Sequence, residues 1–132
     1  MEIKWIEASS LTKVPGFLAT GVACGLKKQG KPDLALICSE EGCVASGVFT
    51  LNRVQAAPVR LSKERIKHGN TIRAIVINAG IANACTGVQG DIDAVSMATM
   101  VESALDLPTG SALVMSTGVI GQFLPMEKIV KG

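Results

Sequence analysis

With 132 residues, 48% of them hydrophobic, and a mean hydropathy of +0.38, the chain fits one domain or part of a larger one and can build a sizeable core. The formal net charge is only +2, and the basic residues are scattered without aromatic neighbours, which argues against nucleic-acid binding. No run of 18 apolar residues occurs, so neither a membrane-spanning helix nor secretion is indicated.

The N-terminal half predicts an antiparallel meander. Phe17–Leu26 is rich in small and apolar residues, and Lys27–Asp33 is expected to be a loop. Leu34–Cys38 predicts a short apolar strand, Ser39–Gly42 a turn, and Cys43–Thr50 a second strand.

The middle of the chain predicts one short helix and one buried strand. Pro58 argues against a central strand around it, because proline cannot donate to a ladder. Ser62 is a suitable N-cap for a helix over Lys63–His68, which Gly69 ends. Ile72–Ile77 is apolar on both faces apart from one arginine, which predicts a strand covered on both sides.

The C-terminal part shows the clearest helical periodicity, over Asp91–Leu107. Asp91 is expected to cap this helix, and Pro108 cannot continue it. Ala112–Met115 predicts another strand, and Leu124–Glu127 begins a further helix. This mixture predicts an α/β (mixed α+β) layered fold whose strands are mostly covered by helices or by a partner.

Two segments of small polar residues directly follow predicted buried strands, namely Asn78–Gly87 and Ser116–Gly121. Ordinary loops have the same composition, because these residues tolerate positive φ and bond their own backbone. Strand ends are also where layered α/β folds bind ligands. A turn of hydroxyls and glycines after a strand can direct an O–H and N–H groups at a developing negative charge. Phosphate binding is a weaker alternative, because neither a Gly-Lys-Ser/Thr ending nor a GxGxxG pattern is present.

The four cysteines do not predict a metal site. They show no CxxC spacing, and one histidine cannot complete a local zinc ligand set. Cys38 and Cys43 flank a predicted turn and could approach each other. Reduced core thiols of a cytosolic protein are the preferred interpretation.

No conventional nucleophile and base are apparent either. Cys85 is expected to be a packed thiol, since His68 falls in a predicted surface helix out of its reach. Ser116 and Thr117 have no evident activating base. As stabilisers of an oxyanion, however, they need none.

Three motifs occur in a fixed order along the chain. They are Gly-Val-Phe-Thr-Leu-Asn-Arg-Val from Gly47, followed by Ala-Ala-Pro-Val from Ala56; Asn-Ala-Cys-Thr-Gly from Asn83; and Ser-Thr-Gly-Val-Ile-Gly from Ser116, followed by Leu-Pro-Met from Leu124. Together they resemble the N-terminal part of the ornithine acetyltransferase (glutamate N-acetyltransferase) family of arginine biosynthesis. The resemblance extends over about residues 14–129.

This resemblance implies a precursor that cuts itself into an α and a β chain. Residues 1–132 would be a single domain, the N-terminal portion of the α chain, in a layered sheet-and-helix fold completed by the β chain. The new N-terminal threonine of the β chain, in an Ala-Thr-Met-Leu context absent from these residues, would be the nucleophile. It would move acetyl from N-acetylornithine to glutamate, and some family members also use acetyl-CoA. An α2β2 hetero-oligomer is expected.

The family's oxyanion-stabilising pair falls on Thr117 and Gly118. Ala79 and Ile81 stand where many relatives have Ser and Asn, so no polar role is transferred to these positions. No metal or other cofactor, nucleic acid or membrane is implied, and the expected compartment is the cytoplasm. Two alternatives stay open: a non-catalytic binding or scaffolding subunit, and a small nucleotide-binding module.

Overall fold

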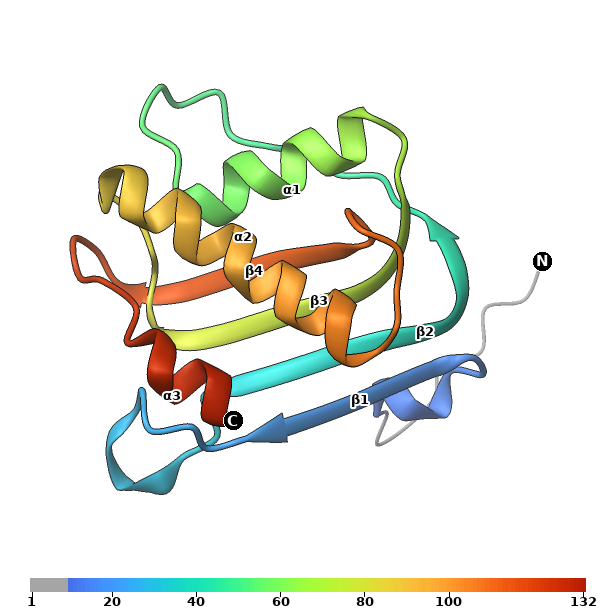
Figure 1. The fold of residues 1–132 in the computed structure, drawn as a ribbon, viewed down its shortest axis with the longest axis horizontal. Helices are drawn as coiled ribbons and strands as arrows, with labels where there is room; N and C mark the ends of the chain where they lie inside the picture. Colours follow the sequence, from blue (N-terminus) through green and yellow to red (C-terminus); the bar gives the residue numbers. More distant parts are fainter. Residues whose placement is uncertain (1–9) are drawn as a thin grey trace, which may run out of the picture.

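The computed structural model describes residues 10–132, in which helices pack on one face of a four-stranded sheet (Figure 1). The spatial strand order is β1-β2-β3-β4; the first three run antiparallel, and β4 is parallel to β3. The strands are β1 Phe17–Val22, β2 Leu34–Val44, β3 Thr71–Ile81 and β4 Ala112–Val119. The helices are α1 Ala57–Lys67, α2 Gly87–Ala104 and α3 Met126–Lys131, with single 3-10 turns η1 Leu11–Lys13 and η2 Lys28–Gly30. The predicted mixed α/β layered fold is confirmed.

The core lies between the sheet and α2, which is the crossover helix that parallel strands require. Alternate residues of β3 and β4 face the helices, among them Val76 and Val114. They meet Met97 and Ala98 of α2, which are fully buried. Small side chains at these contacts let the helix lie close to the sheet, so few large residues are needed.

The predicted break in β2 is wrong. One strand runs through Leu34–Val44, with an irregular register between Cys38 and Cys43, and residues 45–56 form no strand. The side chain of Arg73 explains why the chain does not turn there. Its guanidinium group donates hydrogen bonds to the carbonyl oxygens of Ser39 (3.0 Å) and Glu40 (2.8 Å), and so holds the irregular segment against β3.

Two helices begin earlier than predicted. Helix α1 begins at Ala57 with Pro58 in its first turn, where the missing N–H costs nothing. Ser62 therefore lies inside the helix, where its Oγ donates to the carbonyl oxygen of Val114 (3.0 Å). Helix α2 begins at Gly87, and Asp91, the predicted cap, instead forms an ion pair with an arginine of α1.

Strands β3 and β4 are longer than predicted. Their parallel register continues through Asn78–Ile81 and Ser116–Val119, so both segments are strand where a loop and a turn were expected. The prediction that the middle strand is covered on both sides is also wrong within the described residues. On the face away from the helices, Ile75 and Ile77 of β3 are only half-buried and Met115 of β4 is 53% exposed. We call this surface the open sheet face.

Candidate functional site

The parallel ends of β3 and β4 bring the two polar segments of the sequence together. Beyond the strands, the N–H of Ala82 donates to the carbonyl oxygen of Val119 (2.9 Å). The N–H of Gly121 donates to the carbonyl oxygen of Ala84 (2.8 Å). The loop after β3 and the loop after β4 therefore lie side by side at one end of the sheet.

Thr117 and Gly118 lie within β4 at this end, and both are exposed. Ser116 belongs to the helix-facing series of β4, so alternation places the Thr117 side chain on the open sheet face. Neither residue is sealed beneath packed side chains. An incoming carbonyl group can reach them.

Gly118 is glycine because the backbone of β3 leaves no room for a side chain. Its φ is +134°, and its register partner Gly80 has φ +126°. A Cβ built on Gly118 would overlap the carbonyl group of Gly80 and come within 2.6 Å of the nitrogen of Ile81. This close approach fixes Gly118 relative to β3.

The N–H of Gly118 faces the free edge of the sheet. Strand β4 is an edge strand, and its even-numbered residues direct their backbone groups outward. The N–H groups of Ala112 and Val114 donate to Glu102 Oε1 (3.0 Å) and Ser62 Oγ (3.3 Å). Gly118 continues this series past α1, and no side chain among residues 10–132 accepts from its N–H. With the Thr117 hydroxyl, two neighbouring donors are available at this end.

The loop after β3 is held mainly by its own polar side chains. Asn83 is fully buried; its Nδ2 donates to the carbonyl oxygen of Gly90 (2.8 Å), and its Oδ1 accepts from Thr86 Oγ1 (2.7 Å). The prediction that Cys85 is a packed thiol is wrong, because Cys85 is exposed with φ +57°. His68 lies at the far end of α1, about 16 Å along the helix axis from the end that contacts this loop. Cys85 and His68 therefore form no pair.

The remaining titratable groups serve structure rather than acid–base chemistry. Burial would raise the pKa of Asp33, but hydrogen bonds from the N–H groups of Lys27 and Cys24 (both 2.7 Å) lower this pKa to about 2. Burial raises the pKa of the Cys24 and Cys38 thiols, and all four cysteines are free. Among residues 10–132, no three His, Cys, Asp or Glu side chains gather closely enough to hold a metal ion.

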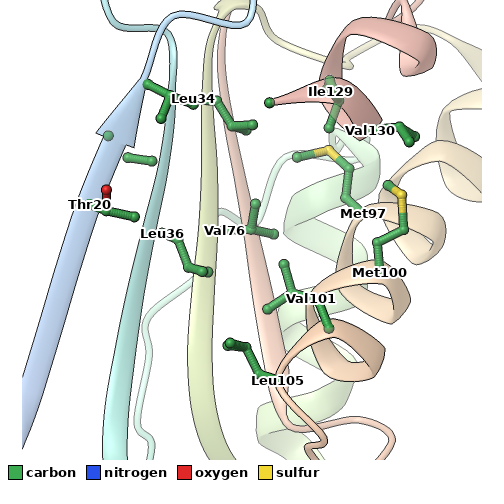
Figure 2. A pocket seen from close by; sticks show the side chains of 15 residues that line it. Thr20, Leu34, Leu36, Val76, Met97, Met100, Val101, Leu105, Ile129 and Val130 are labelled. Carbon is green, nitrogen blue, oxygen red and sulfur yellow. The ribbon is translucent and has the colours of Figure 1, made fainter.

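An apolar groove lies on the helix-facing side, between α2 and the outer strands (Figure 2). Its volume is about 250 Å³, and none of its lining side chains is titratable. Leu34, Leu36, Met97, Met100, Leu105 and Ile129 line it. Because Thr117 points to the opposite face of the sheet, the groove is separate from the two donors.

A sequence model described as the ArgJ family matches residues 18–132. The chain belongs to the ArgJ family. It is 56% identical over 117 residues to the arginine biosynthesis bifunctional protein ArgJ of Caldanaerobacter subterraneus subsp. tengcongensis, covering 89% of this chain and 28% of that protein. It is 49% identical over 122 residues to the mitochondrial ArgJ of Candida albicans, again covering 89% of this chain and 28% of the relative.

Two crystal structures of ArgJ proteins show the same fold. The ArgJ of Bacillus halodurans superposes with a TM-score of 0.91 at 41% identity, over 96% of this chain and 66% of that one. The ornithine acetyltransferase of Mycobacterium tuberculosis, crystallised with ornithine, gives 0.90 at 41% identity, over 96% and 68%. The family resemblance is thus confirmed, and this ArgJ chain spans less than a third of the relatives' length. No helix within residues 10–132 has the length and hydropathy that crossing a membrane requires.

Proposed function

We propose that this chain is the oxyanion-holding part of an acetyltransferase that moves acetyl from N-acetylornithine to glutamate in arginine biosynthesis. The observation that carries the proposal is the exposed pair of donors, the Thr117 hydroxyl and the Gly118 N–H, at the end of a strand locked against β3. Family membership and the names of the relatives supply the reaction. Acetyl-CoA is proposed as a second donor, and no metal is required.

The reaction needs these donors at the acetyl carbonyl oxygen. A threonine hydroxyl of a β chain attacks the amide carbon of N-acetylornithine, and its own α-amine takes the proton. The carbonyl oxygen becomes an oxyanion, which Thr117 and Gly118 stabilise. The C–N bond then breaks, and ornithine leaves with the proton on its amine. The amine of glutamate attacks the resulting threonine ester, which returns the hydroxyl and releases N-acetylglutamate.

The open sheet face is where we place the polypeptide that brings the nucleophile. Besides Thr117, this face carries Ile75 and Ile77, Met115, and Val119, which is 57% exposed. An exposed apolar face of this kind marks a surface that packs against more protein. We therefore propose a cleaved α/β pair, assembled as α2β2, in which residues 1–132 form one domain of the α chain. Four free cysteines fit the reducing cytoplasm as its compartment.

Thr117→Ala in the assembled enzyme, meaning this chain together with its β chain, tests the proposal. We expect kcat for acetyl transfer from N-acetylornithine to glutamate to fall about 100- to 1000-fold, as for other lost oxyanion donors, with KM nearly unchanged. Thr117→Ser keeps the hydroxyl and should retain most activity. Thr99→Ala, the same change at an exposed position of α2, should be silent.

The rival functions give other results. A scaffolding subunit predicts that Thr117→Ala leaves the kinetics unchanged, and a ground-state binding role predicts a rise in KM alone. Either outcome contradicts the oxyanion role. Saturable nucleotide binding without acetyl transfer would favour the nucleotide-binding module.

A further inference from the structure

Two buried polar atoms beside the donor pair have no hydrogen-bond partner among the described residues. They are Asn78 Oδ1 and Ser116 Oγ. Asn78 is 0% exposed, and the two residues are direct register partners on neighbouring parallel strands. Both belong to the helix-facing series of their strands, so their side chains share one side of the sheet.

The other half of the Asn78 amide is already engaged. Its Nδ2 donates to the carbonyl oxygen of Ile81 at 2.8 Å, so the side chain spans Ala79 and Gly80. Gly80 is the residue whose carbonyl group lies against Gly118. A continuous set of contacts therefore leads from the Asn78 amide, through the Gly80–Ile81 backbone, to the donor Gly118.

The two atoms without partners are chemically complementary. A serine hydroxyl can donate one hydrogen bond, and an amide oxygen accepts two. Neighbouring strands lie about 4.8 Å apart, which a rotation of the Ser116 side chain can bridge. Burial away from water makes this pairing favourable, because neither atom has a competing partner.

We propose that Asn78 and Ser116 form a positioning pair for the oxyanion donors, with the Ser116 hydroxyl donating to Asn78 Oδ1. The bond fixes the orientation of the amide, so that Nδ2 stays on the Ile81 carbonyl and Gly80 keeps the shape against which Gly118 rests. Neither side chain touches the substrate. The catalytic consequence rests on the function proposed above.

The satisfied amide of Asn83 provides a contrast. Its Oδ1 already accepts from Thr86, and its Nδ2 holds Gly90 of α2. That side chain fastens a loop to a helix and contacts neither Gly80 nor Gly118. Asn78 has the same chemistry, but it is connected to the strand that carries the donors.

The test compares Asn78→Ala with Asn70→Ala in the assembled enzyme. Asn70 also donates from Nδ2 to a backbone carbonyl, that of Gly110 at 3.1 Å, but lies just before the start of β3, at the opposite end of that strand. We expect Asn78→Ala to lower kcat at least tenfold with KM within twofold, and Asn70→Ala to stay within twofold in both. Ser116→Ala should lower kcat about threefold or more, and the double variant of Asn78 and Ser116 no further than Asn78→Ala, because both act through one contact.

Amide hydrogen exchange over residues 116–121 gives a readout that does not depend on the reaction. Exchange should be faster in Asn78→Ala and Ser116→Ala and unchanged in Asn70→Ala. Wild-type kcat and exchange in Ser116→Ala, an equal loss in the Asn70 control, or additive losses in the double variant would each overturn the proposal. If the wild-type enzyme transfers no acetyl group, the proposed function fails, and exchange alone decides the positioning role. If Asn78→Ala does not fold, Ser116→Ala decides it, because that change removes only an unpartnered hydroxyl.

Discussion

Replacing Gly118 by alanine should damage both stability and catalysis, and the structure sets the size of each effect. The new Cβ would overlap the carbonyl group of Gly80 and lie 2.6 Å from the nitrogen of Ile81. Ordinary contact begins at 3.4 Å, so the Ile81 nitrogen alone must move by about 0.8 Å relative to Gly118. The φ of +134° adds backbone strain of about 1–3 kcal/mol, and overpacking typically costs a further ~1–3 kcal/mol. We expect a loss of about 2–6 kcal/mol in the free energy of unfolding.

The catalytic loss follows from the same displacement. A reacting group misplaced by about 1 Å can cost on the order of 100-fold in rate, so kcat should fall by about that factor. Urea denaturation and steady-state kinetics on the assembled enzyme measure the two effects. Gly69→Ala is the matched control: its φ is +70°, no atom lies within 4 Å of its Cβ position, and it follows the C-terminus of α1.

The control should lose only about 1–2 kcal/mol of stability, from the left-handed backbone, and no activity. The reasoning is refuted if Gly118→Ala loses no more stability than Gly69→Ala and keeps kcat within twofold of wild type. In that case the close approach of β4 to β3 would not be what holds the donor.

Two further predictions concern stability. Glu102→Ala removes the buried carboxylate that accepts from the Arg65 guanidinium (2.6 Å) and from two backbone N–H groups (3.0 Å each), and should cost about 3–5 kcal/mol by urea denaturation. Asp91→Ala breaks an ion pair whose side chains are half exposed, and should cost under about 1 kcal/mol; equal losses in the two variants would contradict this account. Because the pKa of Asp33 is lowered from 3.8 to about 2, its contribution is fully present above about pH 4 and is lost as the pH falls toward 2. Between about pH 5 and pH 2 the urea midpoint should thus fall less in Asp33→Asn than in wild type, and parallel curves would count against the hydrogen bonds to this carboxylate.

Local patterns predicted the kinds of elements but often not their limits. The apolar runs within β3 and β4 and the periodicity of α2 belong to neighbouring residues, so they are readable in one dimension. The segment Asn78–Ile81 has the composition of a loop, yet it pairs as strand because β4 offers it a parallel partner. Ser62 is a plausible cap by type, yet it lies inside α1, since its hydroxyl finds the backbone of Val114. In both cases a partner distant in sequence supplies the hydrogen bonds that decide the outcome.

By itself, the sequence determined the family, the mixed α/β class and the small polar groups that follow the buried strands, because residue types and their order are sufficient for these. Only the tertiary structure decided which way those groups face. Thr117 points to the open sheet face and Ser116 to the helices, because strand register sets the alternation. The N–H of Gly118 is unpaired because β4 ends the sheet, and which strand lies at an edge depends on contacts among segments far apart along the chain.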